Sequence, residues 1–403
     1  MSKYYQELQD FMRGLRVVST HCHHKPDEFF DDDFGLRKII ENSYAAWCGF
    51  EIGETNEEHE LFINKLRHRS FFFWLEKSLC EIYGVDEALS AGTFALFDEK
   101  IREAHRKDKG RHIRLMQEVC NYDKVIQDAY WEPGSDNGHP ELFNATFRID
   151  SYMPAYDKEK VDHDDQNAAL LFGVEFENVN AVINHIEQKL IEGKEKGVVA
   201  VKCAAAYERP LDFMPTSKEQ AGRVFEVSRE KRRKEDEKAF QDYLFHEVCD
   251  LAGRMNLPLQ VHTGLGSLAG TNAMRLLPAI QCHPNTKFVL FHGGYPWTDD
   301  VLGLAHLYPT QIYPDLCWLP LISPAKAESF VSELVDIVMD GAICWGCDAW
   351  TSEESYGALL AARHVLAKAF SAKIKEGRFS FGDACGYIEG ILHDNAEELY
   401  KMI

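Results

Sequence analysis

The sequence of 403 residues lacks an excess of basic charge, long apolar runs and an apolar N-terminal leader. Lys and Arg number 44 against 65 Asp and Glu, so the formal net charge is −21. Nucleic acids and anionic membrane surfaces are recognised by basic faces, and this balance argues against both as partners. No run approaches the roughly 18 uncharged apolar residues of a membrane-spanning helix. The first twelve residues follow helical spacing, with acids and amides between the apolar ones, so we expect no secretory signal.

The 11 cysteines do not resemble a disulfide framework, because their number is odd and they are scattered along a long chain. We therefore expect a reducing, cytoplasmic environment. Cys344 and Cys347 form a C-x-x-C motif, which can indicate redox chemistry or half of a zinc site. The motif lies in an apolar run that predicts a strand, where positions three apart face opposite sides, and there is no second C-x-x-C. We expect both thiols to pack in the core.

The composition is that of a globular protein, with 45% hydrophobic and 27% charged residues. A chain of this length suits either two domains or one α/β barrel of about 250 residues with about 150 additional residues. No internal repeat, low-complexity segment or Pro/Gly/Ser-rich linker divides it. We therefore expect a single domain over residues 1–403.

Short apolar strands alternate with helical stretches, which is typical of repeated βα units and predicts a (β/α)8 TIM barrel. Residues 27–121 follow the first strand, show helical spacing and predict a helical insertion over one end of the barrel. Ser217 to Asn256 predicts a long charged helix, and its alternating run Arg229–Lys238 is expected to be solvated. The eight predicted strands are Leu15–Thr20, Lys124–Asp128, Phe143–Ile149, Gly197–Cys203, Pro258–His262, Lys287–His292, Gln311–Trp318 and Ala342–Asp348.

Histidines and one aspartate stand at the ends of four predicted strands. His21 and His23 are two apart and share a face, so both imidazoles can reach one cation, with the intervening cysteine turned away. His262, His292 and Asp348 each end a further strand, and in a barrel these ends converge on the face that carries the active site. A lone histidine is more often structural than a metal ligand. Burying a His or Asp without a partner, however, costs several kcal/mol of desolvation free energy. A divalent metal would supply the partner for the whole set.

Three other patterns leave more than one interpretation. Lys202 ends the fourth strand and could be a carboxylated ligand bridging two metals, an ammonium that binds a substrate oxygen, or a lysine that extends to solvent. Gly264, Gly266 and Gly270 have a spacing one residue too long for a dinucleotide-binding loop, so we expect a flexible loop. The three adjacent acids 31–33 are expected to be solvated.

The strand-end pattern resembles the amidohydrolase superfamily, which has H-x-H on strand one, His on strands five and six and Asp on strand eight. Phe291–Pro296 and Ile391–Tyr400 are similar to its amidohydrolase-related branch. Lys202–Arg209 resembles the K-S-x-A-A-Y-R segment of the nodulin/FluG-type members.

A second resemblance is to uronate isomerases. His21-Cys22-His23 and Ala145–Asp150 resemble their H-C-H and T-F-R-P-D segments. Uronate isomerases also carry a helical insertion after the first strand. The Cys-Asp-Ala sequence around Asp348 differs from their usual residues.

The resemblance implies a metal-dependent hydrolase that acts on an amide, ester or lactone bond. His21, His23 and Asp348 would hold one divalent ion, with His262 as a further ligand, and zinc or manganese suits this donor set. A second ion would make Lys202 a bridging carboxylate. Asp348 would take the proton of a metal-activated water and pass it to the leaving group. His292 would polarise the scissile carbonyl or stabilise the developing oxyanion.

We expect a small substrate with a carboxylate, bound by Lys202 and by the planar forks of Arg148 and Arg209. Each arginine could instead form a surface ion pair. We expect three aromatic side chains to form the pocket walls: Tyr207, Trp297 and Trp350. Each of them could instead pack at the barrel rim. Aldose–ketose isomerisation of a uronic acid, nonoxidative decarboxylation and a metal-binding barrel without turnover are the alternatives. We also expect a homo-oligomer.

Overall fold

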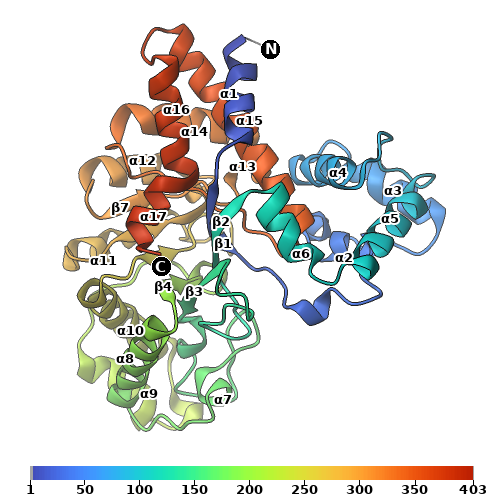
Figure 1. Ribbon diagram of the computed structural model, residues 1–403. Coiled ribbons are helices and arrows are strands. Elements are labelled where there is room, and N and C mark those ends of the chain that lie inside the picture. Colours follow the sequence, from blue (N-terminus) through green and yellow to red (C-terminus); the bar gives the residue numbers. More distant parts are fainter. Residues whose placement is uncertain (1–2, 403) are drawn as a thin grey trace.

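The computed structural model describes residues 3–402, and its centre is a curled sheet of seven parallel strands in sequence order (Figure 1). Each strand pairs with the next one along the chain, and a helical connection separates most pairs. Seven predicted strands are thereby confirmed; their ends shift by at most two residues, except that the seventh ends four residues earlier than predicted. The strands are β1 (Val17–Cys22), β2 (Tyr122–Gln127), β3 (Phe143–Arg148), β4 (Val198–Cys203), β5 (Leu259–Val261), β6 (Phe288–Leu290) and β7 (Ile312–Pro314).

Residues 342–348 lie between β7 and β1 and close the ring. On one side, the amide of Cys344 donates to the carbonyl of Pro314 at 3.1 Å. On the other, Thr20 donates to the carbonyl of Trp345 at 3.1 Å, and Asp348 donates to the carbonyl of His21 at 3.0 Å. Only one ladder bridge forms here, so the predicted eighth strand is an irregular segment in the place of a strand. The fold is an α/β barrel of the TIM type.

Strand alternation divides the apolar side chains between two cores. Inward-facing residues such as Val18, Ile126 and Val289 fill the barrel, and Tyr400 of the last helix packs in the same cluster. Outward-facing residues such as Val261 pack against the surrounding helices. These helices are α1 (Lys3–Arg13), α7 (Ala168–Leu171), α8 (Val179–Glu195), α9 (Lys218–Glu226), α10 (Lys234–Met255), α11 (Leu277–Cys282), α12 (Thr298–Leu307), α13 (Leu319–Ile322), α14 (Pro324–Ile337), α15 (Ser352–Lys375), α16 (Phe381–Glu389) and α17 (Asn395–Tyr400).

The predicted long helix from Ser217 to Asn256 is two helices, α9 and α10. They are separated at residues 227–233, where Arg229 and Arg232 pair with Asp157 instead of continuing a helix face. The charged run therefore spans a break, and most of it is exposed as expected.

The stretch between β1 and β2, residues 27–121, forms a group of helices that we call the helical arm; it extends to one side of the barrel (Figure 1). Thr55 and Glu58 form a capping box that starts one helix, and Gly84 ends another in a left-handed conformation, with φ of 60°. Helix α4 buries Phe72, Leu79 and further side chains of one face in a core that belongs to the arm. The helices of the arm are α2 (Leu36–Glu41), α3 (Asn56–Leu66), α4 (Ser70–Tyr83), α5 (Phe94–Lys107) and α6 (Arg111–Arg114).

Among the described residues, no helix combines the length and the apolar character needed to span a bilayer.

Candidate metal centre and pocket

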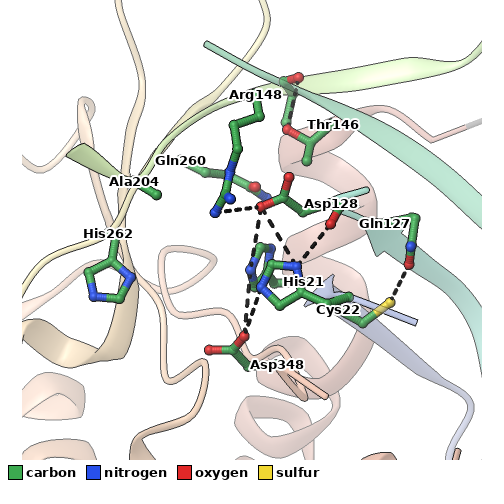
Figure 2. Close-up of polar contacts among 12 residues, drawn as sticks. His21, Cys22, Gln127, Asp128, Thr146, Arg148, Ala204, Gln260, His262 and Asp348 are labelled. Carbon is green, nitrogen blue, oxygen red and sulfur yellow. Dashed lines mark hydrogen bonds and ion pairs between the residues drawn. The ribbon is translucent and has the colours of Figure 1, made fainter. Parts of the chain in front are cut away.

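Three side chains from opposite ends of the chain meet at the mouth of the barrel. The Nε2 atoms of His21 and His23 lie 3.6 Å and 3.4 Å from Oδ1 of Asp348. All three residues are buried, and their candidate ligand atoms lie within 4.8 Å of one another. Figure 2 shows the ring of His21 between the carboxylates of Asp128 and Asp348. Two imidazoles and a carboxylate form a donor set that suits a divalent cation such as zinc or manganese.

An irregularity in β1 turns the two histidines into the pocket. Val18 points into the barrel, and strict alternation would turn His21, three residues later, to the opposite side. The pairing of β1 with β2 shifts register between Ser19 and Cys22, which allows His21 to face inward as well. Cys22 packs in the outer core, and its thiol donates to Gln127 at 2.8 Å, as expected for a side chain turned away from the site.

The surroundings of these histidines keep them in the form that binds metals. Burial lowers the pKa of His23 and holds the pKa of His21 well below its ordinary value, so both are neutral at neutral pH. Nδ1 of His23 lies 2.9 Å from the carbonyl oxygen of Asp128. A carbonyl only accepts, so Nδ1 carries the proton and the lone pair of Nε2 faces Asp348.

Asp128 is a buried acid that the sequence analysis did not single out. Its Oδ2 lies 3.9 Å from Nε2 of His21 and 3.2 Å from Nη2 of Arg148. Neither of its side-chain oxygens has a hydrogen-bond partner among the described residues, and the same holds for Nδ1 of His21. A cation bound beside them would offset the cost of these buried groups. The sequence signal for Asp128 is its position at the end of the second predicted strand, which corresponds to the position of Asp348 at the end of the eighth.

His292 lies beside the other oxygen of Asp348. Its Nδ1 is 3.7 Å from Oδ2 of Asp348 and 2.9 Å from the carbonyl oxygen of Cys317, and burial lowers its pKa to about 4. His262 is hydrogen-bonded to His292, with 3.0 Å between the nitrogens, and to the carbonyl of Leu265. His262 thus lies outside the group formed by the other ligands, on the far side of the site (Figure 2), which differs from the predicted four-residue set.

The backbone at this end of the barrel is strained in two places. His292 and Asp348 both adopt positive φ, at 64° and 55°. Such conformations in side-chain-bearing residues concentrate at functional sites, where surrounding structure holds them. Gly346 permits the close approach of the closing segment to β1, because a Cβ there would lie 2.8 Å from the amide nitrogen of His21. These features direct the Asp348 carboxylate toward the histidines.

Lys202 is fully buried in the pocket and does not extend to solvent. It is 1% exposed, and its Nζ lies 3.9 Å from the centre of the Phe291 ring. Burial lowers its pKa. The solvent-facing interpretation is therefore wrong, whereas the substrate-binding ammonium and the carboxylated ligand both fit this position.

The predicted arginines lie in different surroundings. Arg148 lines the pocket, but its guanidinium faces Asp128, Asp150 and Asp164. Burial works to lower the pKa of Arg148, and these carboxylates outweigh that effect and raise it. The prediction that Arg209 binds the substrate is not supported, because Arg209 lies outside the pocket and pairs with Asp242 of α10 at 2.6 Å.

The predicted aromatic walls are also divided. Tyr207 and Trp350 line the pocket, whereas Trp297 is 37% exposed and does not, which corrects its predicted role. The pocket has a volume of about 370 Å³, within the range of roughly 300–1,000 Å³ that is typical of ligand sites. The residues that line it are His21, His23, Lys25, Glu41, Asn42, Ser43, Tyr44, Trp47, Tyr130, Arg148, His163, Asp164, Lys202, Tyr207, His262, His292, Asp348 and Trp350.

The helical arm supplies one wall of the pocket, which the sequence analysis did not assign to particular residues. Tyr44 stacks on Trp318 with 4.5 Å between the ring centres, and Trp47 lies 6.0 Å from Trp350. Trp350 in turn stacks on His23 at 5.5 Å. An aromatic cluster therefore connects the arm to the candidate metal ligands.

Two adjacent buried glutamates at the start of α15 attach the arm to the barrel. Glu353 accepts hydrogen bonds from Tyr83 at 2.6 Å and from His105 at 3.0 Å, both in the arm. Glu354 accepts from the backbone amides of Tyr44, at 2.8 Å, and of Trp350, at 3.3 Å. Burial raises the pKa of Glu354 to about 8. One carboxyl group thus positions two of the aromatic residues around the pocket.

Comparisons with known proteins agree with this geometry. The model of a family described as "Amidohydrolase" matches residues 222–402, which include His262, His292 and Asp348. The fluG protein of Emericella nidulans is 29% identical over 227 residues. That match covers 52% of this chain but 26% of the relative, so it spans about a quarter of the fluG protein's length.

Solved structures resemble the chain over nearly its whole length. A Lactobacillus casei protein described as a candidate metal-dependent hydrolase has a TM-score of 0.69 at 18% identity, covering 98% of this chain and 97% of its own. A uronate isomerase of Thermotoga maritima has a TM-score of 0.77 at 15% identity, with coverages of 99% and 98%. A glucuronate isomerase of Caulobacter crescentus has a TM-score of 0.76 at 14% identity, with coverages of 99% and 94%. At these identities the likeness concerns the fold.

Proposed function

We propose that this chain, a member of the amidohydrolase superfamily, is a metal-dependent hydrolase of a small substrate that carries a carboxylate. One observation carries the proposal: the two oxygens of Asp348 face different partners. Oδ1 faces the histidine pair at the end of β1, His21 and His23, and Oδ2 faces His292. One carboxylate can therefore take part in metal binding and in proton transfer at the same time.

His21, His23 and Asp348 would hold the cation, and Asp128 would add negative charge beside it. When bound, a divalent cation acidifies water and polarises a carbonyl group, both of which hydrolysis requires. The buried side-chain atoms of His21 and Asp128 that lack hydrogen-bond partners support this assignment. We expect one ion per chain, zinc or manganese.

Asp348 and His292 would carry the proton transfer. Oδ2 of Asp348 would take a proton from the attacking water and return it to the leaving group. His292 is neutral at neutral pH, since burial lowers its pKa to about 4, and its single proton lies on Nδ1, toward the carbonyl of Cys317. Beside Oδ2 of Asp348, it would hold that carboxylate in position for the proton transfer. His262, hydrogen-bonded to His292, would orient that imidazole and not bind the metal.

Two lysines are the best-placed groups for the substrate carboxylate. Lys25 and Lys202 both line the pocket, and neither forms a salt bridge with a described residue. Arg148 is already neutralised by three carboxylates, so we expect it to position Asp128 more than to bind the substrate. The arm residues Tyr44 and Trp47 would close over the apolar part of the substrate.

The test is turnover by metal-loaded protein on a panel of carboxylate-bearing amides, esters and lactones. Asp348→Asn should abolish turnover and reduce bound metal while the circular dichroism spectrum stays unchanged. Trp297→Phe is the matched control, because Trp297 lies outside the pocket, and it should retain full activity. Full activity of Asp348→Asn, or wild-type protein that binds no metal, would contradict the proposal.

A second candidate is isomerisation of a uronic acid. Its support is the His21-Cys22-His23 motif, the arm after the first strand, and fold likeness to two uronate isomerases over 99% of this chain. The same panel should include uronates, with ketose formation followed by NMR. Turnover of uronates without hydrolysis of any other substrate would favour this candidate over the first.

A further inference from the structure

A second cavity lies between helices α1, α4 and α15, and it shares no lining residue with the candidate active site. Its volume is about 480 Å³, which is also within the usual range of roughly 300–1,000 Å³ for ligand sites. Figure 1 shows α1 and α15 side by side, and the arm's α4 packs against α15.

The wall of this cavity contains a buried guanidinium without a counter-ion. Arg363 of α15 is 4% exposed. Its Nε and Nη2 atoms have no hydrogen-bond partner, and it forms no salt bridge with any residue from 3 to 402. A buried cation without a partner is costly, and such groups in proteins are normally paired. In a chain with net charge −21, a buried arginine that is paired with no carboxylate is therefore informative.

The other polar groups around Arg363 cannot serve as its counter-ion. Burial lowers the pKa of Arg363, and the nearest opposing effects come from Tyr356, Cys120 and Tyr122. Burial also raises the pKa values of these phenols and this thiol, so they are neutral at neutral pH. The acid that lines the cavity, Glu81, accepts a hydrogen bond from Tyr356 at 2.8 Å instead.

The rest of the cavity combines positive charge with apolar walls. Lys77 and Arg13 line it together with Arg363, against the single lining acid Glu81; Arg13 also pairs with Asp10 at 2.8 Å. Lys77 lies 5.7 Å from the centre of the Trp74 ring. Phe73, Trp74, Val119 and Leu360 supply apolar surface.

We propose that this cavity binds a small organic anion, with a carboxylate, sulfonate or phosphate group on Arg363 and an apolar body against the aromatic side chains of α4. The anion would supply the negative charge that this guanidinium lacks within the chain. The site is distinct from the proposed catalytic pocket and does not depend on its chemistry.

Isothermal titration calorimetry of the metal-loaded full chain with benzenesulfonate tests the proposal, because this anion is singly charged, aromatic and resistant to hydrolysis. One equivalent should bind. Sulfate, which lacks the apolar body, and benzyl alcohol, which lacks the charge, should each bind at least about tenfold more weakly. Loss of a charge-assisted hydrogen bond corresponds to roughly 10- to 100-fold in affinity, which is the loss expected for Arg363→Met.

A second variant tests the proposal in case Arg363→Met does not fold. Phe73 is 46% exposed, so Phe73→Glu should fold normally and weaken binding by repelling the anion. Phe381→Glu is the matched control, because it adds the same charge at a position that is 38% exposed and does not line the cavity. It should leave the affinity within about twofold of wild type.

Three outcomes would overturn the proposal. The first is the absence of benzenesulfonate binding to the wild type. The second is binding that survives Phe73→Glu and disappears in Lys25→Met, which would place the anion in the catalytic pocket. The third is a dimer that Arg363→Met dissociates in sedimentation experiments, which would mean that a carboxylate of a second copy fills the cavity.

Discussion

Removing the charge of Glu353 is expected to loosen the attachment of the helical arm. The side chain is completely buried in the first turn of α15, where Tyr83 and His105 of the arm donate hydrogen bonds to the same oxygen. Glu353→Gln keeps the size and shape of the side chain but replaces the carboxylate with an amide. The change therefore tests the charge and not the packing.

The expected magnitude follows from the pKa of this carboxyl group. Burial works to raise it, but the hydrogen bonds from His105 and Tyr83 outweigh burial and lower it from 4.5 to about 2. Such a difference between unfolded and folded states corresponds to about 3 kcal/mol of stability at neutral pH. Because the folded pKa is depressed, this contribution is complete above pH 4.5 and is lost as the pH falls toward 2. At pH 3.5 about 1.4 kcal/mol of it should already be gone.

The assay is the free energy of unfolding from urea titrations of both proteins at pH 7.0 and at pH 3.5. The deficit of Glu353→Gln should be about 3 kcal/mol at pH 7.0 and about half to two-thirds of that at pH 3.5. Hydrogen exchange of peptides from α4 and α5 at pH 7.0 should show faster exchange in the variant. Glu376→Gln, an exposed substitution at the end of the same helix, should change stability by less than about 0.5 kcal/mol. A deficit independent of pH, or unchanged exchange in the arm, would refute the reasoning.

Three further predictions concern the pocket. Dialysis against a chelator should abolish turnover and lower the melting temperature by several degrees, since a ligand that binds only the native state stabilises it; zinc or manganese should restore both, and a melting temperature unchanged by the chelator would count against the metal centre. Asp128→Asn should reduce metal affinity at least about tenfold by equilibrium dialysis, because it removes a charge beside His21, and wild-type affinity would show that Asp128 has no part in binding the cation. Trp47→Ala should raise KM about tenfold with kcat within about twofold, since Trp47 is half-exposed at the pocket rim and its ring contacts are with other aromatic residues; a loss confined to kcat would be the opposite of this expectation.

The parts of the site that sequence could predict are those that depend on strand ends. Parallel strands in a barrel present their C-terminal ends on one face, so the strand-end residues His21, His292 and Asp348 had to come close together. The order of the strands followed from the alternation of apolar runs and helices. These inferences need no knowledge of side-chain partners.

The sequence could not predict features that depend on tertiary partners. The register shift after Ser19, which turns His21 inward, arises from pairing with a strand about 100 residues away. Arg209 stands next to the pocket in sequence, but a carboxylate on α10 draws it away. Asp128 carries the same strand-end signal as Asp348, but its neighbours in sequence form no recognisable motif.

The distance in sequence between the two halves of the metal centre has a consequence for biosynthesis. The histidines of β1 leave the ribosome more than 300 residues before Asp348, and the segment that carries Asp348 is also the one that closes the ring. At roughly 5–20 residues per second, this interval lasts from about 15 seconds to about a minute. During that time the nascent chain offers only part of the ligand set, together with an open barrel edge. We therefore expect metal loading at this candidate site and ring closure to be late, linked events, and a chain truncated before residue 342 to lack both.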